Sequence, residues 1–128
     1  MLDTDICIYA LNNPSNVLIQ NFQDHADQIC ISTITEYELT FGAYKSTRAG
    51  ENIVKLQRFI TRLEVLQLSS AAAEHAGHIR AELEQAGTPI GPYDTLIAGH
   101  ARSEGLTLVT NNQREFDRVS GLLIDNWR

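Results

Sequence analysis

Short β-forming segments alternate with longer helical segments along the whole chain, and this alternation constrains the fold more than any other feature. Strands are predicted where β-forming apolar residues cluster, at residues 1–3, 28–32, 64–68, 106–110 and 122–127. Helices are predicted where apolar residues recur at helical spacing, at residues 5–11, 15–26, 33–46, 47–63, 69–85 and 92–104. Strands separated by helices indicate an α/β fold with a mostly parallel sheet, whose sites lie at the carboxyl ends of the strands.

Length and charge limit the classes of protein that the chain can be. A length of 128 residues predicts a single domain over residues 1–128. The formal net charge of −6 argues against a simple nucleic-acid-binding module, although not against a nuclease whose acids surround cations. Cys7 and Cys30 lie in apolar runs and are expected to be reduced core residues. No membrane-length apolar run or signal peptide is visible, so a cytoplasmic protein is expected.

Glu38 is the acid whose position is most informative. On its helix it shares a face with Ile34 and Phe41, which is the face expected to point toward the core. Burying a carboxylate there is costly unless it is paired with a basic group or bound to a metal. The sequence leaves three interpretations open: a buried ion pair, a half-buried face, or a metal site.

Asp3 and Asp94 are two further candidates. Asp3 follows the first predicted strand, where it either caps the next helix or enters a site. Asp94 shares the inner face of its helix with Ile97 and Ala98, but it also lies in the first turn, where the helix dipole favours an acid. Burying acids from separate elements is costly, but a shared hard divalent cation such as Mg²⁺ or Mn²⁺ would offset that cost, because such a cation prefers oxygen ligands.

Three long motifs carry these acids, and together they resemble one family. The motifs are MLDTDICIY, ISTITEYELTFGAYKS and GTPIGPYDTLIAGHARSEGLTLVTNNQREFDRVSGLLIDNW. They resemble the opening, central and C-terminal signatures of VapC-type toxins, which are ribonucleases with a PIN domain. The resemblance implies a PIN fold over residues 1–128, with three α/β/α layers around a central, mostly parallel five-stranded sheet. It assigns the metal ligands to Asp3 and Asp94, with Glu38 as a further ligand or water-orienting group.

The same resemblance implies an activity and partners. It implies an Mg²⁺-dependent endoribonuclease, for which Mn²⁺ substitutes, that cleaves tRNA and thereby inhibits translation. Some of the toxins with the most similar motifs cut initiator tRNA. The implied partners are a VapB-like antitoxin, which threads a C-terminal segment across the active site, and a second copy of the chain. We therefore expect a homodimer that joins the antitoxin in a hetero-oligomer.

The chain departs from the family pattern at two positions. Asp5 stands where asparagine is common, so it either supports the site as a polar group or adds negative charge that shifts metal affinity. Asn112 stands where many PIN domains carry an acid, and we expect Glu115 to take that role instead. The catalytic set is then Asp3, Glu38, Asp94 and Glu115, with Asp5, Thr110 and Asn112 as supporting residues.

The remaining candidates are weaker. His75 and His78 are three residues apart on a helix, but no cysteine or third histidine is near them in sequence. Lys45 and Arg114 are the expected phosphate contacts. Lys45 is expected on the same helix face as Glu38, and Arg114 directly precedes Glu115. Tyr93 is expected in the core or at an interface rather than stacked on a base.

Two alternative functions share this fold. One is a non-catalytic RNA-binding or regulatory domain, and the other is a structure-specific DNA nuclease. The residues alone favour a cluster of carboxylates that binds a cation. The terms ribonuclease and toxin rest on the resemblance.

Overall fold

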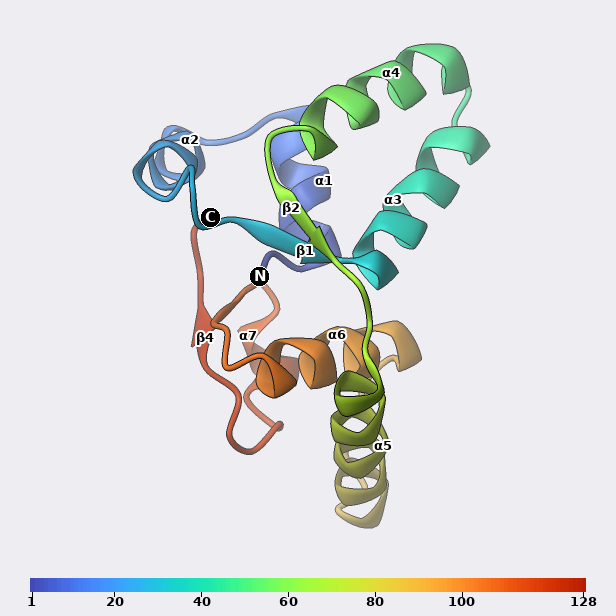
Figure 1. Ribbon diagram of the computed structural model, residues 1–128, viewed down its shortest axis with the longest axis vertical. Helices are drawn as coiled ribbons and strands as arrows, with labels where there is room; N and C mark the ends of the chain where they lie inside the picture. The colour runs from blue at the N-terminus through green and yellow to red at the C-terminus, as the bar shows by residue number, and fades with distance from the viewer.

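A computed structural model describes residues 1–128, and it confirms the predicted alternation of helices and strands (Figure 1). The elements, in chain order, are α1 (Thr4–Asn12), α2 (Asn16–Asp24), β1 (Cys30–Ser32), α3 (Thr33–Lys45), α4 (Ala49–Ile60), β2 (Glu64–Leu66), α5 (Ser70–Gln85), α6 (Pro92–Ser103), β3 (Leu108–Val109), α7 (Gln113–Phe116) and β4 (Ile124–Asp125). The segment 111–116, expected as a turn, contains the one-turn helix α7. None of the helices combines the length and apolar character that a membrane span requires.

The strands form two short parallel ladders, β1 with β2 and β3 with β4. The segment Met1–Asp3 lies between the ladders and joins them. The amide of Leu2 donates to the carbonyl of Cys30 at 2.9 Å, and the amide of Val109 donates to the carbonyl of Met1 at 2.8 Å. The expected parallel arrangement is confirmed. The expected count of five strands is not confirmed, because the first segment forms only a single bridge, from Leu2 to Val109.

Alternate residues of these extended segments enter two different cores, as the two-residue period of a strand requires. Leu2 and Val109 pack with side chains of α1, α2, α3 and α4. Their chain neighbours Met1 and Leu108 pack with side chains of α5, α6 and α7. Helices therefore cover both faces of the strands, which confirms the three-layer arrangement (Figure 1).

The two cysteines belong to opposite cores. Cys7 packs on the side of α1 to α4 and Cys30 packs on the side of α5 to α7. Both are free and buried, so the expectation of reduced core residues is confirmed.

Helices α5 and α6 pack against each other at a contact that requires glycine. A Cβ placed on Gly99 of α6 would lie 2.5 Å from the backbone nitrogen of Ala76 and 2.7 Å from its Cα. Atoms of the backbone cannot move aside as the end of a flexible side chain can. Gly99 therefore fixes how closely α6, the helix that carries Asp94, approaches α5.

Replacing Gly99 by alanine is expected to destabilise the protein, because the added methyl group forces α5 and α6 apart. We expect a loss of about 1–3 kcal/mol in the free energy of unfolding, measured by urea denaturation. Gly77→Ala is the matched control, since Gly77 lies in α5 with no atom within 4 Å of an added Cβ. The control should gain roughly 0.5–1 kcal/mol, because alanine favours a helix interior. Equal effects of the two substitutions would contradict this account of the contact.

Candidate active site

Asp3 serves both as a helix cap and as a member of the site. Its Oδ1 accepts a hydrogen bond from the amide of Ile6 at 2.9 Å, which caps the first turn of α1. Its Oδ2 accepts a hydrogen bond from the hydroxyl of Thr110, at the carboxyl end of β3. The residue is 3% exposed. The two sequence interpretations of Asp3 are therefore compatible, because one oxygen serves the helix and the other points toward β3.

Glu38 lies beside the buried face of α3 rather than on it. The buried residues of α3 are Thr35, Leu39 and Ala43, whereas Phe41 is 59% exposed. The prediction that Glu38 and Phe41 share the core-facing side is therefore wrong. Apolar residues occur on every side of α3, so their spacing alone does not identify its inner face.

The carboxylate of Glu38 is nevertheless held in place. It is half-buried, and its Oε1 accepts a hydrogen bond from the hydroxyl of Thr4 at 2.7 Å. The same Thr4 oxygen lies 3.2 Å from the hydroxyl of Thr35. Thr4 follows Asp3 directly, so Glu38 is tied to the same end of α1 that Asp3 caps.

Asp94 lies in the first turn of α6 and is half-buried, with Ile97 and Ala98 of the same face fully buried. Burial, with a smaller contribution from negative charges nearby, raises the pKa of Asp94 to about 6. The residues that carry these charges are Asp3, Glu38, Asp5 and Glu115. Each of these four carboxylates therefore lies close enough to Asp94 for its charge to act on it.

Asp3 has the same electrostatic character. The pKa of Asp3 is raised to about 6, chiefly by burial. The hydrogen bonds from Thr110 and Ile6 act against this rise, and the charges of Asp5 and Glu38 add to it. The site is therefore a place where several carboxylates repel one another and where a positive charge would relieve the repulsion.

A chain of hydrogen bonds connects Asp3 to Glu115 through the turn after β3. Thr110 donates to Asp3, and its hydroxyl oxygen also accepts from the amide of Asn112 at 2.9 Å. The side-chain amide of Asn112 then donates to Oε2 of Glu115 at 3.0 Å. Asn112 therefore holds the carboxylate of Glu115, and the role of Glu115 as the fourth acid stays a prediction.

The donor atoms fit a hard divalent cation, because they are all carboxylate oxygens. As the side chains stand, no three Asp, Glu, His or Cys residues are grouped closely enough to hold a metal ion. The carboxylates therefore surround a shared space without forming a finished ligand cage.

The histidines take other roles. His75 accepts a hydrogen bond from the guanidinium of Arg102 at 3.0 Å, and His78 is exposed. His100 is buried, with its Nδ1 2.8 Å from the hydroxyl of Ser32. Burial lowers the pKa of His100, which favours a neutral ring. The structure therefore places His75 and His100 in contacts between elements, and no metal-binding group includes them.

Both basic residues expected to contact phosphates are exposed, and their role stays a prediction. Lys45 lies on the exposed side of α3, with its ammonium 5.6 Å from the centre of the Phe41 ring, and Arg114 is exposed on α7. Sequence reasoning missed Arg128, whose guanidinium lies 4.3 Å from the centre of the Tyr9 ring. Arg128 lines a hollow of about 510 Å³ together with Asp5 and polar side chains of the loops around it. No local sequence pattern connects Arg128 with α1, so only the tertiary structure reveals this position.

Tyr93 is exposed, so of the expected core or interface positions the core position is wrong and the interface position stays a prediction. It is 42% exposed, and its hydroxyl lies 3.3 Å from the hydroxyl of Tyr37. The hydrogen bond with Tyr37 raises the pKa of Tyr93, and the charge of Glu38 adds a smaller effect. An exposed aromatic pair therefore lies at the edge of the acidic site.

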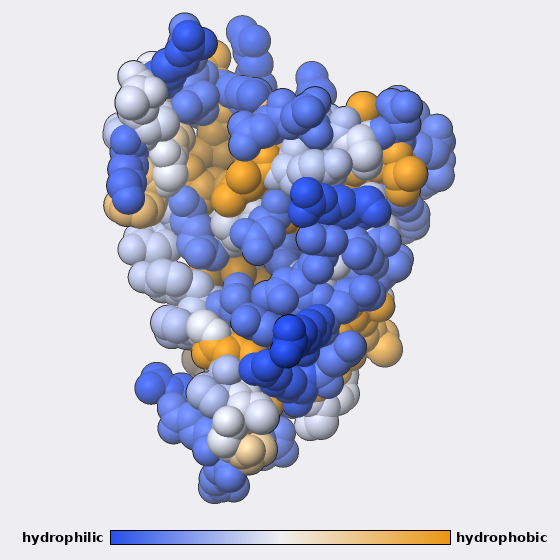
Figure 2. Space-filling model, turned by 180° about the vertical axis from the view of Figure 1, so that it is seen from behind, coloured by the Kyte–Doolittle hydropathy of each residue, from blue (hydrophilic) through white to orange (hydrophobic).

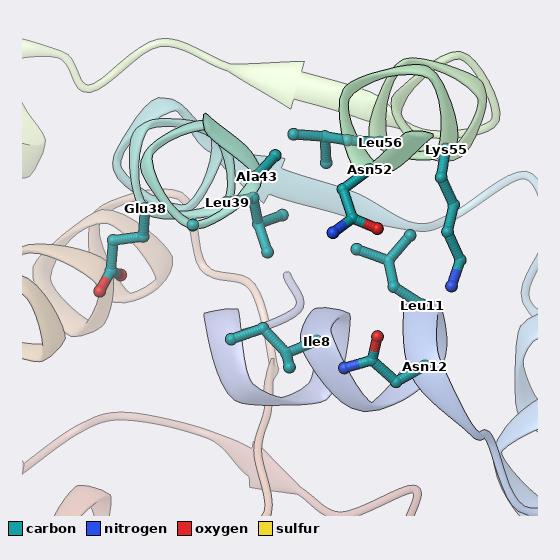
Figure 3. Close-up of a pocket in the computed structure, with 10 residues that line it drawn as sticks. Ile8, Leu11, Asn12, Glu38, Leu39, Ala43, Asn52, Lys55 and Leu56 are labelled. Atoms are coloured by element: carbon teal, nitrogen blue, oxygen red, sulfur yellow. The ribbon is translucent and has the colours of Figure 1, made fainter. Parts of the chain in front are cut away.

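An apolar groove of about 230 Å³ leads away from Glu38 between α1, α3 and α4. Figure 3 shows Glu38 at one side of the groove and Lys55 at the other, with Ile8, Leu39 and Leu56 among the lining side chains between them. Figure 2 shows the molecule from behind as a largely hydrophilic surface, interrupted by several separate hydrophobic patches. The apolar lining therefore extends from the middle of α4 to the Glu38 carboxylate.

Comparison with known proteins assigns the family. The family model described as the PIN domain matches residues 1–122, and the chain belongs to the PIN-domain family. Within that family, the chain is similar to VapC proteins. The tRNA(fMet)-specific endonuclease VapC of Salmonella typhimurium is 49% identical over 127 residues, which cover 99% of this chain and 96% of the relative. Ribonuclease VapC2 of Haemophilus influenzae is 45% identical with the same coverage of both chains.

Solved structures agree with this assignment. A chain of the DNA-bound VapBC complex from Salmonella typhimurium superposes with a TM-score of 0.97 at 48% identity, covering 100% of this chain and 97% of that one. A chain of VapBC2 from Rickettsia felis, bound to a DNA fragment from its promoter, gives a TM-score of 0.95 at 42% identity and covers 100% and 98%. The expected PIN fold and the VapC resemblance are confirmed. PIN-domain ribonucleases generally use divalent metal ions.

The repulsion among the carboxylates predicts how stability depends on pH without metal. The pKa of Asp94 is about 6 in the folded protein, above its ordinary value of 3.8. Between pH 3.8 and pH 6, Asp94 is protonated in the folded protein but ionised in the unfolded chain. The stability that the protonated Asp94 contributes is therefore lost as the pH rises through 6. In EDTA at about pH 7.5, Asp94→Asn should raise the melting temperature by about 2–5 °C, measured by differential scanning fluorimetry.

The matched control for this experiment is Asp27→Asn, an exposed acid just before β1, at the end of the strand away from the site. It should leave the melting temperature and its pH dependence near those of the unaltered protein. The gain from Asp94→Asn should shrink as the pH falls toward 4, because Asp94 is then protonated in any case. A gain that is unchanged across this range would contradict the repulsion.

Proposed function

We propose that this chain is a metal-dependent endoribonuclease and the toxin of a VapBC-type toxin–antitoxin pair. The observation that carries the proposal is that the charges of Asp3, Glu38 and Glu115 all act on Asp94, while hydrogen bonds hold Glu38 and Glu115 in place. The electrostatics support it, because the negative charges act on one another through a shared space. The family supports the reaction class, since similar proteins are named as endonuclease and ribonuclease.

Mg²⁺ is the proposed cation, with Mn²⁺ as a substitute, and Asp3, Glu38 and Asp94 are the residues that would hold it. A bound Mg²⁺ supplies positive charge at the phosphodiester and makes a nearby water more acidic. Each carboxylate arrives with its own support from the protein. Thr110 fixes Asp3, and Thr4 fixes Glu38. The first turn of α6 presents Asp94 toward the other acids.

Glu115 is proposed to complete the catalytic set. Its Oε2 is held by the side-chain amide of Asn112, which leaves Oε1 free to accept a hydrogen bond from a water molecule. Asp5, exposed at the start of α1, adds negative charge beside the set. The chain therefore provides carboxylates to hold the cation and one further carboxylate to orient a water or receive its proton.

The proposed substrate is tRNA, with initiator tRNA as the specific candidate. The name of the Salmonella relative specifies tRNA(fMet), and 49% identity over nearly the whole chain supports the transfer of that substrate class. Cleavage of tRNA inhibits translation, so we propose that the protein acts in the cytoplasm.

The proposed partners are a VapB-like antitoxin and a second copy of this chain, in a hetero-oligomer. The similar solved structures are named as VapBC complexes. The apolar groove between α1, α3 and α4 supports the antitoxin assignment, because a bound peptide segment lying in it would reach Glu38. Lys45 and Arg114 stay the proposed phosphate contacts, and the position of Arg128 adds a third basic group for that role.

Replacing Asp94 by asparagine tests the activity directly. With purified protein, Mg²⁺ and tRNA transcripts, we expect at least about 100-fold slower cleavage, because a metal-holding charge is lost while the fold remains. Mapping of the RNA ends shows whether a single bond is cut. Asp27→Asn should cleave at the unaltered rate.

The alternatives give different results in the same assay. A non-catalytic RNA-binding domain would bind the transcript and cut nothing, with or without Mg²⁺. A DNA nuclease would cut a DNA hairpin of matched sequence at least as fast as the RNA. Either result, or an Asp94→Asn variant that cleaves normally, would overturn the proposal.

Thr110→Val tests the support of Asp3. Valine keeps the shape of threonine but removes the hydroxyl that donates to Asp3 and accepts from the amide of Asn112. We expect about 10- to 100-fold lower activity or metal affinity, the usual cost of losing a group that orients a ligand. The control is Thr107→Val, an exposed threonine just before β3 whose side chain makes no hydrogen bond in the structure. Equal cleavage rates for both variants would show that Asp3 needs no such support.

A further inference from the structure

We propose that Tyr37 and Tyr93 form a platform on which one base of the RNA stacks next to the cleaved bond. The inference rests on the endoribonuclease function proposed above and adds to it the residues that position the substrate. Neither tyrosine belongs to the carboxylate set, and neither is buried in a core.

The two tyrosines are brought together by the fold and not by local sequence. Tyr37 lies on α3 and Tyr93 on α6, 56 positions apart in the chain. Their ring centres are 5.5 Å apart, with 55° between the ring planes, and their hydroxyl oxygens are 3.3 Å apart. Each ring thereby limits the movement of the other, so less conformational freedom remains to be lost when a ligand binds.

The pair lies directly beside the carboxylates. Tyr37 immediately precedes Glu38 and Tyr93 immediately precedes Asp94. The charge of Glu38 acts on both Asp94 and Tyr93, so the tyrosine hydroxyl and the acids lie within the same short range. A nucleotide whose phosphate reaches the acids therefore has its own base, or that of a neighbour, within reach of the rings.

The charge of the site makes an uncharged contact valuable. Converging carboxylates repel phosphates, and the chain as a whole carries a net charge of −6. Part of the affinity for RNA must therefore come from contacts other than ion pairs. Stacking of one base on an aromatic ring strengthens binding by about 5- to 150-fold and tolerates any base. The exposed fractions of Tyr37 and Tyr93, 54% and 42%, leave ring surface for such a contact.

Two more exposed aromatic residues of α3 provide the contrast. Phe41 and Tyr44 are 59% and 66% exposed and lie one and two turns farther along the helix from Glu38. The Phe41 ring is approached by the ammonium of Lys45, and neither residue contacts α6 through an aromatic pair. Tyr37 differs from them because its hydroxyl is directed to Tyr93 and thus to the acidic site. The pair therefore fits a substrate, whereas Phe41 and Tyr44 are suited to matched controls.

The experiment measures single-turnover cleavage of a tRNA transcript at increasing protein concentration, which separates the half-saturating concentration from the maximal rate. For Tyr37→Ala and Tyr93→Ala we expect the half-saturating concentration to rise about tenfold or more, with the maximal rate within about threefold. Tyr93→Phe keeps the ring and should stay within about twofold of the unaltered protein. Tyr44→Ala should leave both quantities unchanged.

A second arm uses the unaltered protein, so it does not depend on the folding of a variant. Transcripts carry one abasic nucleotide at each position around the mapped cleavage site. One position should raise the half-saturating concentration as much as Tyr93→Ala does, and the two changes combined should cost no more than either alone. Losses that add in full, or no sensitive position, would overturn the platform.

The remaining outcomes separate the proposals. Unaltered protein that cuts no RNA overturns the proposed function. Unaltered protein that cuts RNA, while both alanine variants match its half-saturating concentration, overturns the platform alone. If light scattering shows that the alanine variants change the molar mass of the protein without affecting RNA binding, the pair is a protein interface and the platform is overturned.

Discussion

The segment Met1–Asp3 is the part of the molecule on which the rest depends. Its backbone hydrogen bonds join the β1–β2 ladder to the β3–β4 ladder, and its alternate side chains enter the two cores. The third residue of the segment, Asp3, then begins α1 and contributes the most deeply buried carboxylate of the site. The same few peptide groups therefore connect the sheet, divide the cores and place a functional acid.

The site shows how a protein keeps like charges close together. Their repulsion is offset by hydrogen bonds from neutral groups, namely the hydroxyls of Thr4 and Thr110 and the side-chain amide of Asn112. These donors hold Glu38, Asp3 and Glu115 without neutralising them, so their negative charge stays available to attract a cation. Lysine or arginine in their place would stabilise the acids but would also compete with the cation.

Much of this could be predicted from the sequence. The spacing of apolar residues predicts the helices and strands, because each element buries one face. The same spacing on α6 predicts that Asp94 lies on its inner face. The same reasoning failed for the surroundings of Glu38, since α3 carries exposed aromatic residues opposite its buried face. The link from Thr110 to Asp3 joins residues 107 positions apart, and no periodic pattern reports such a contact. The pairing of Tyr93 with Tyr37 depends on how α6 meets α3, so the sequence around Tyr93 alone could not predict it.

The central position of Met1–Asp3 has a consequence for the timing of assembly. Leu2 pairs with Val109, and Asp3 accepts from Thr110, so the beginning of the chain completes its contacts only with residues near the end. Long-range pairings of this kind form late, because closing the large intervening loop must precede them. During synthesis on the ribosome, the growing chain therefore carries an incomplete site until Val109 and Thr110 have emerged. A site built in this way cannot act while these residues are still inside the ribosome.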